Sequence, residues 1–139
     1  MNYRKYQTTR VWLHFLTLPF IWLPLPFILA LDLVCALYQF VCFPIYQIKY
    51  VKRSEFILVM DRNKLDYLNG VEKLCCMYCG YANGVFRYMK EIAGLTEKYW
   101  CGVMHENKPG FRVQEDQVTQ DFARFGDKAD FDKKYGKIS

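Results

Sequence analysis

The stretch VWLHFLTLPFIWLPLPFILALDLVCALYQFVCFPIYQI, residues 11–48, decides the fold. It runs for 38 residues, and Asp32 is its only formally charged side chain. An apolar run of about 18 residues or more is a candidate for a membrane-spanning helix. The rest of a chain of 139 residues is too small to cover such a run in a soluble core. We therefore expect residues 11–48 to enter a membrane.

Prolines at positions 19, 24 and 26 interrupt the first half of this run. Proline removes a backbone donor and clashes with the preceding turn, so it kinks or breaks a helix. The uninterrupted part, residues 27–43, barely crosses a hydrocarbon core of about 30 Å at about 1.5 Å per residue. Two arrangements are therefore open. One is a re-entrant hairpin bent at residues 24–26, and the other is a surface helix over residues 8–18 followed by one tilted span.

Basic residues stand on both sides of the apolar run. They are Arg4, Lys5 and Arg10 before it, and Lys49, Lys52 and Arg53 after it. Because three basic residues lie on each side, the positive-inside rule does not predict which end of the span faces the cytoplasm. Cations next to an apolar segment favour anionic headgroups over nucleic acid, and we expect no nucleic-acid partner. Because a carboxylate is costly in lipid, Asp32 should contact a partner subunit, form an internal ion pair or lie near the headgroups.

Residues 51–105 predict a helical hairpin. Asp61 or Asn63 can cap a first helix over residues 64–78, and a second helix covers residues 85–100. Gly80, Asn83 and Gly84 mark the turn between them. Residues 54–62 are expected as a short strand or as an extension of a helix. The first helix places an apolar face toward its partner, made by Leu65, Leu68, Val71 and Leu74.

The tail, residues 106–139, holds seven cations and seven anions and few aliphatic residues. The whole formal charge of +5 therefore lies in the first 105 residues. Phenylalanines recur along the tail, and they favour an extended segment that packs on a partner or on the helical core. The sequence thus predicts a mainly α protein in three parts: a membrane anchor with basic flanks (1–50), a helical metal-binding domain (51–105) and an extended tail (106–139).

Four cysteines and one histidine carry the strongest ligand pattern. Cys76 and Cys79 form a C-x2-C pair, and Cys101 and His105 form a C-x3-H pair after 21 intervening residues. Three thiolates and one imidazole fill a tetrahedral Zn²⁺ shell, and four protein ligands are typical of a structural site. Cys75 can substitute for Cys76. Iron is the alternative metal, and free thiols, a disulfide or a redox dithiol are the alternatives to a metal.

The segments that hold these ligands resemble a family of short bacterial membrane-associated proteins of uncharacterised function. The resemblance rests on DRNKLDYLN, EKLCCMYCGYANG, EIAGLTEKYWC and the following His105, and more loosely on FARFGDKADF in the tail. It implies Cys76, Cys79, Cys101 and His105 as shared metal-type residues, with Cys75 as an extra. It also implies a bacterial origin, but it carries no reaction.

No P-loop, GxSxG, HExxH or dinucleotide fingerprint occurs in the sequence. We therefore expect a non-enzymatic accessory subunit of a bacterial inner-membrane complex or homo-oligomer, with its soluble part in the cytoplasm. Membrane lipids are the second expected partner. An iron or dithiol redox partner of a membrane enzyme is the alternative, and a lipid-handling enzyme at the membrane surface is a third hypothesis.

Overall fold

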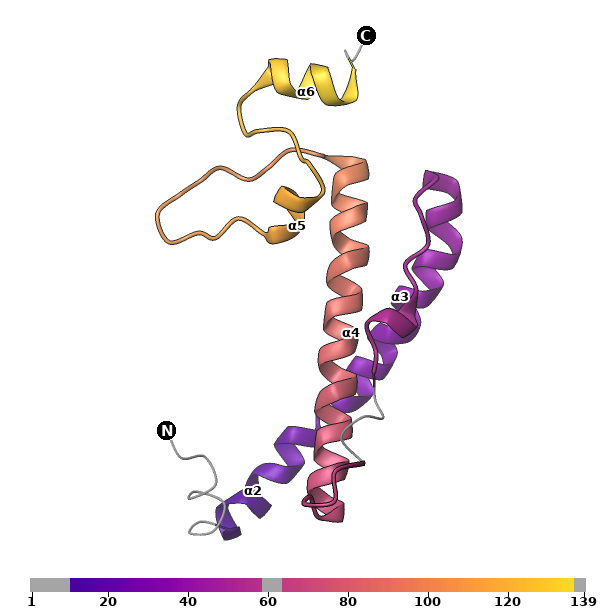
Figure 1. The fold of residues 1–139 in the computed structure, drawn as a ribbon, viewed down its shortest axis with the longest axis vertical. Helices are drawn as coiled ribbons and strands as arrows, with labels where there is room; N and C mark the ends of the chain where they lie inside the picture. The colour runs from indigo at the N-terminus through magenta and orange to yellow at the C-terminus, as the bar shows by residue number, and fades with distance from the viewer. Residues whose placement is uncertain (1–10, 59–63, 137–139) are drawn as a thin grey trace.

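The computed structural model describes residues 11–58 and 64–136, and this part of the chain is mainly helical (Figure 1). Its helices are α2 (Val11–Trp22), α3 (Leu25–Tyr46), the 3-10 turn η1 (Arg53–Glu55), α4 (Gly70–Trp100), α5 (Glu115–Thr119) and α6 (Lys128–Tyr135). The described residues contain no β-strand, and Val103 and Ala123 form an isolated parallel bridge. The prediction of a mainly α chain with a long apolar helix near its start is confirmed.

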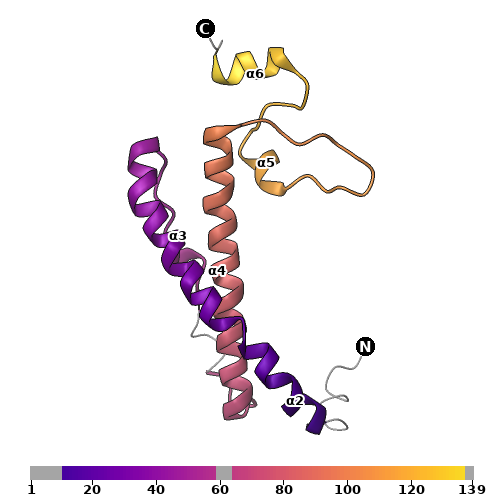
Figure 2. The same cartoon turned by 180° about the vertical axis from the view of Figure 1, so that it is seen from behind.

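The prolines bend the apolar segment without folding it back. Leu23 N–H donates to the carbonyl of Pro19, and Ile28 N–H donates to that of Pro24, each at 2.9 Å. The first bond closes the last turn of α2 and the second opens the first turn of α3, so only residues 23 and 24 separate the two helices. Figures 1 and 2 show the two helices following one bent path. The predicted re-entrant hairpin is therefore not adopted.

Together, α2 and α3 form an apolar stretch from Trp12 to Tyr46. It has 35 residues and a mean hydropathy of 2.2 in its most apolar part, of which only 11% is buried inside the protein. By length and composition alone, this stretch could cross a membrane.

Helix α4 begins later than predicted. Its N-cap is Asn69, whose Oδ1 accepts the backbone N–H of Glu72, while Oε2 of Glu72 accepts the backbone N–H of Asn69, both at 2.9 Å. This reciprocal capping box satisfies two donors that the first turn leaves unpaired. Leu65 and Leu68 therefore precede the helix. The predicted caps Asp61 and Asn63 lie outside the described residues.

The predicted helical hairpin is instead one helix of 31 residues. Gly80 and Gly84 stand four residues apart on one face of α4, where the preceding segment passes. A Cβ on Gly84 would lie 2.8 Å from the carbonyl oxygen of Phe56 and 2.9 Å from Cα of Ile57. The glycines thus permit close backbone approach, as in small-xxx-small packing, and do not make a turn.

Helices α3 and α4 run side by side in the same direction. Just before α3, the ring of Trp22 at the end of α2 stacks on that of Tyr78 in α4, with centroids 4.8 Å apart. At their ends, Tyr46 stacks on Tyr99 at 4.5 Å and contacts Trp100 edge-on. The packing of α4 on α3 therefore extends over nearly the full length of α3.

The chain returns between the two helices through residues 48–58, which we call the return segment (Figure 1). It contributes Val51 to a buried cluster with Phe43, Tyr88 and Ile92. A second buried cluster, formed by Ile28, Ala82 and Val85, lies nearer the start of α3. The core is thus a seam between α3, α4 and the return segment.

The tail is folded over its described part, in contrast to the extended segment that the sequence predicts. Ala123 N–H donates to the carbonyl of Gly102 at 2.7 Å, and Met104 N–H donates to that of Ala123 at 2.8 Å. Phe122 is 2% exposed. Helix α5 packs on α4, where Lys90 and Asp116 form an ion pair of 3.4 Å. The sequence predicts that the tail packs on a partner or on the helical core, and the structure shows it packed on the helical core.

Candidate functional site

The polar side chains of α3 face the protein interior. Asp32 is 7% exposed, and Gln39, seven residues later, is fully buried. Seven residues are close to two turns of a helix, so the two side chains share one face. We call their network the polar seam: Asp32, Gln39, Arg53, Tyr81 and Tyr88.

Asp32 joins α3 to both other parts of the seam. Nε of Arg53 donates to Oδ1 of Asp32 at 3.0 Å, and Nη2 donates to Oδ2 at 2.5 Å. The hydroxyl of Tyr81 on α4 donates to Oδ2 at 2.8 Å. Burial and the Asp32 carboxylate raise the pKa of Tyr81. This carboxylate is thus in an internal ion pair, one of the three arrangements expected of it.

Gln39 makes the second contact of the seam. Its Nε2 donates to the carbonyl of Val51 at 3.0 Å and lies 3.1 Å from the hydroxyl of Tyr88, and its Oε1 accepts Val51 N–H at 3.0 Å. The amide thereby satisfies both backbone groups of a buried return-segment residue. Burial raises the pKa of the Tyr88 hydroxyl. The polar seam holds three segments together and has the character of a structural network.

The opposite face of α2 and α3 is apolar and exposed, and we call it the outer face. Within the described residues it carries no charged side chain of Asp, Glu, Lys or Arg. Its large exposed members on α3 are Phe27, Leu29, Leu31, Leu33, Val34, Leu37, Phe40, Val41 and Ile45. A contiguous apolar surface of this size marks a contact with lipid or with another protein.

The basic residues predicted to meet the membrane have different surroundings. Lys49 is exposed just after α3. Lys52 lies 3.8 Å from Glu55, and both side chains are mostly exposed. Arg53 is tied to Asp32, with about half of its side chain exposed.

The predicted zinc ligands do not come together in this conformation. Cys76 and Cys79 lie in α4, and Cys101 is its C-cap. Separations of 25 and 22 residues along a continuous helix correspond to about 38 and 33 Å, whereas a zinc shell needs ligands within about 2.3 Å of one ion. Across the described residues, no group of three or more His, Cys, Asp and Glu side chains is placed to hold a metal. Cys75 lies in the same turn as Cys76 and is as far from Cys101.

His105 belongs to the contacts of the tail. Its Nε2 lies 3.5 Å from Oε1 of Glu97, and its ring meets Phe111 edge-on. Its backbone N–H donates to Oε1 of Gln117 at 3.1 Å, and Nε2 of Gln117 donates to Glu97 at 2.7 Å. Gln117 is fully buried. This amide therefore fixes the loop after Cys101 against the end of α4.

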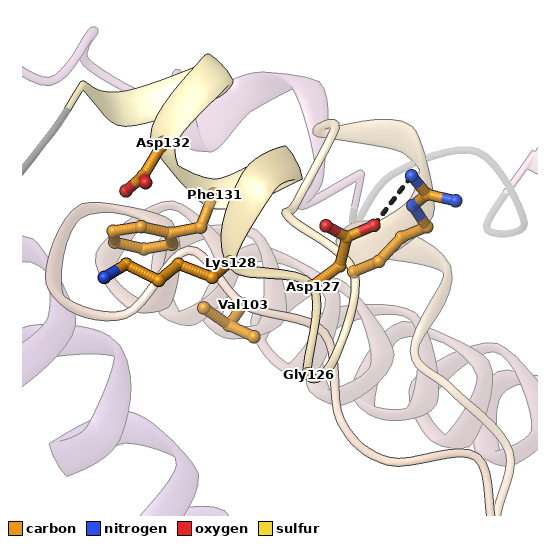
Figure 3. A pocket seen from close by; sticks show the side chains of 7 residues that line it. Val103, Gly126, Asp127, Lys128, Phe131 and Asp132 are labelled. Carbon is orange, nitrogen blue, oxygen red and sulfur yellow. Dashed lines mark ion pairs between the residues drawn. The ribbon is translucent and has the colours of Figure 1, made fainter.

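The tail also encloses an open hollow of about 690 Å³ (Figure 3). Figure 3 shows Phe131 and Lys128 close together and Asp127 toward the other side. Arg124 is held by Asp127 at 2.8 Å and by Asp130 at 3.7 Å. The N–H of Arg124 donates to Asp130, and this bond lowers the pKa of that carboxyl. Arg124 and Asp127 at the hollow are thus paired with each other, and the lining holds no thiol, hydroxyl or imidazole.

Three functional contacts were missed by reasoning from the sequence: Gln39 to Val51, Arg53 to Asp32, and Gln117 to Glu97. A signal existed for the first two, because Asp32 and Gln39 are spaced seven apart in an otherwise apolar helix. Gln117 has no comparable signal in its surroundings.

Comparisons of the chain with protein-family models, curated proteins and solved structures found no match in any of the three.

Proposed function

We propose that this chain is a small accessory subunit of a bacterial inner-membrane complex, attached to the membrane by the outer face of α2 and α3. It has no catalytic role of its own in this proposal, and its soluble part lies in the cytoplasm. The observation that carries the proposal is the inverted distribution of polarity in α3. Asp32 and Gln39 are buried against protein, while most of its large apolar side chains are exposed.

This distribution favours lipid as the surroundings of the outer face. In water, exposed side chains such as Phe27, at 66%, and Leu33, at 72%, would be better buried, and Gln39 better hydrated. In a bilayer the preference is reversed, because polar groups in lipid face the protein interior and pair with one another. Asp32, which accepts from Arg53, and Gln39, which accepts from Val51, follow that rule.

The accessory role is supported by the nature of the remaining surface. The polar seam links segments of the protein to one another, and Arg124 and Lys134 of the tail pair with carboxylates within the tail. At the end of α4, Tyr99 and Trp100 remain exposed by 50% and 68%. Tyrosine and tryptophan are enriched at contacts between proteins, so we assign these two side chains to a partner contact.

Membrane attachment is tested with Leu33→Glu and Leu37→Glu, which add a carboxylate to the outer face. We expect both variants to move from the carbonate-resistant membrane fraction to the soluble or aggregated fraction. Ala93→Glu, at an exposed position of α4, is the matched control and should stay with the membrane. Attachment that survives both outer-face substitutions would overturn the proposal.

The accessory role has its own test. The chain, tagged and produced at its native level, is extracted in a mild detergent and its assembly size is measured. We expect an assembly larger than one chain with its detergent, reduced in size by Trp100→Ala and Tyr99→Ala together. A folded monomer as the sole species would contradict the accessory role and leave attachment standing.

A zinc-type site remains a separate prediction that rests on the spacing of Cys76, Cys79, Cys101 and His105. These residues fit a zinc shell by chemistry but not by position along a continuous α4. Iron, or a redox dithiol, is the alternative and would make the chain an electron-transfer partner. Elemental analysis and an absorbance spectrum separate these cases, since Zn²⁺ is colourless.

A further inference from the structure

We infer that α2 and α3 lie in the plane of the membrane, within one leaflet, and that the chain does not cross the bilayer. The occupant of the outer face is the acyl-chain region of that leaflet, with anionic headgroups around its rim. Helix α4 and the return segment then cover α3 on the water side. This inference rests on the proposed membrane attachment and adds its geometry.

The first reason is that α4 accompanies α3 from end to end. The aromatic stacks of Trp22 on Tyr78 and of Tyr46 on Tyr99 mark the two limits of the contact. Any path that takes α3 through the hydrocarbon core therefore takes most of α4 and the return segment with it.

The second reason is the position of charges along this pair. Residue 35 is the midpoint of the uninterrupted apolar stretch, residues 27–43. Asp32 lies three residues from it, about 5 Å along the axis, and holds the half-exposed guanidinium of Arg53. A crossing α3 would place Arg53 near the centre of the bilayer, where a charged group is most costly.

Other exposed charges lie along the middle of the helix pair, beside residues 32–39 of α3. Lys52 and Glu55 flank Arg53 with side chains 72% and 63% exposed. On α4, exposed Arg87 directly precedes Tyr88, which contacts Gln39. In a crossing arrangement these side chains would face lipid. In the in-plane arrangement they face water.

The third reason is that polarity divides across the helix pair and not along it. Phe27, Val34, Val41 and Ile45 recur at intervals of seven, seven and four residues, so they form one stripe along α3. Their exposed fractions are 66, 58, 50 and 70%. The apolar side runs along α3, and exposed charges lie on the return segment and on α4 from Arg87 onward. An apolar side opposite a charged side is the pattern of an interfacial helix. Exposed Lys49 and Lys52 supply cations for anionic headgroups at the rim.

The test measures the depth of that stripe. Single cysteines replace Phe27, Val34, Val41 or Ile45 in a chain whose six native cysteines are changed to alanine, and each carries a nitroxide. The full chain is reconstituted into vesicles of phosphatidylcholine and phosphatidylglycerol. Depth is read from the relative accessibility of the nitroxide to oxygen and to a water-soluble nickel chelate. Arg87→Cys on α4 is the control position.

We expect one shallow, oxygen-accessible depth for all four stripe positions, and water exposure at position 87. A crossing helix would instead give a depth profile spread over about 27 Å across eighteen residues, deepest near the middle of the stripe. That result would overturn the in-plane inference and leave attachment intact. Water exposure at all four positions would overturn both.

A second measurement uses the unmodified chain, so that it does not depend on folding of the cysteine-free protein. Polarised infrared spectra of the protein in supported bilayers report the tilt of its helices through the amide I dichroism. We expect helix axes near the membrane plane. Because α3 and α4 are aligned, a crossing arrangement would turn both toward the membrane normal and reverse the sign of the dichroism.

Discussion

At the scale of single residues, the bond between Asp32 and Arg53 ties the return segment to α3. The carboxylate is nearly buried and the guanidinium is half exposed. Hydrogen bonds to charged groups contribute about 1.5–3 kcal/mol, and partial exposure of Arg53 reduces this through solvent screening. We therefore expect Asp32→Asn and Arg53→Gln each to lower the free energy of unfolding in detergent by about 1–2 kcal/mol.

The double variant distinguishes a direct pair from two independent effects. If the two side chains stabilise the fold through each other, the double variant should cost little more than either single one. Asp66→Asn is the control, because Asp66 is an exposed carboxylate before α4. Additive costs in the cycle would show that the ion pair does not stabilise the fold.

Tyr81 links the stability of the seam to pH. Its pKa is raised by burial and by the hydrogen bond to the Asp32 carboxylate. The folded state therefore holds the phenolic proton more tightly than the unfolded state, whose tyrosine pKa is about 10. The resulting stability is fully present below about pH 10 and is lost as the pH rises toward the folded pKa.

This titration is measured as the free energy of unfolding against pH, for the wild type and for Tyr81→Phe. We expect the difference between the two chains to be constant up to about pH 9 and to shrink above about pH 10. Tyr67→Phe serves as the control, because Tyr67 is 71% exposed. A difference that stays constant through the alkaline range would contradict the role of Tyr81.

At the scale of elements, Gly84 sets how closely the return segment approaches α4. A methyl group there would meet backbone atoms of Phe56 and Ile57 at 2.8 and 2.9 Å. We expect Gly84→Ala to destabilise the protein by about 1–3 kcal/mol, although alanine is the better helix former. The measurement is chemical unfolding followed by circular dichroism.

Gly70 provides a matched control for this substitution in the same helix. A Cβ on Gly70 would have no atom within 4 Å. Gly70→Ala should therefore be neutral or stabilise by up to about 1 kcal/mol, through reduced freedom of the unfolded chain. Equal effects at the two positions would mean that the return segment does not pack closely on Gly84.

The same glycines show where sequence reasoning succeeds and where it stops. The long apolar run and the mainly α character are properties of local composition, and both were predicted. Gly80, Asn83 and Gly84 were read as a turn, because glycine breaks local periodicity whether it permits a turn or a close contact. The difference depends on residues 56–58, and a window around Gly84 does not contain them. The capping box at Asn69 and Glu72 is visible in the sequence as a local signal, and it places the start of α4 later than Asp61 or Asn63 would.

At the scale of the whole molecule, the structure is an apolar helix covered along one side by an amphipathic one. The polar seam pairs its polar side chains with one another and with backbone groups inside the protein. The stability of the helix pair therefore does not require water on the outer face. The tail is fixed to the far end of α4 through Gln117 and leaves the outer face uncovered. This arrangement gives one short chain an apolar exposed surface on one side and a polar, folded surface on the other.

The predicted zinc ligands are distributed along α4 and the loop that follows it. The zinc site is therefore a prediction about the whole molecule. Spacing in sequence cannot establish distance in space, and here a continuous helix holds Cys76 and Cys79 about 33–38 Å from Cys101. If the purified protein carries one zinc per chain through these residues and His105, α4 must break between Cys79 and Cys101 or ligands must come from two molecules. If α4 stays continuous in a single chain, no such metal should be bound.

Elemental mass spectrometry of the purified chain, with Cys76→Ser and His105→Ala, measures the metal and its ligands. Circular dichroism before and after chelation reports whether α4 changes. The continuous helix predicts no stoichiometric zinc or iron, unchanged helicity on chelation and rapid maleimide labelling of the exposed Cys79 and Cys101. One zinc per chain that is lost in both variants, with thiols protected from maleimide, would instead establish the site predicted from the sequence. Residue 107, an asparagine outside the ligand pattern, provides the control substitution Asn107→Ala.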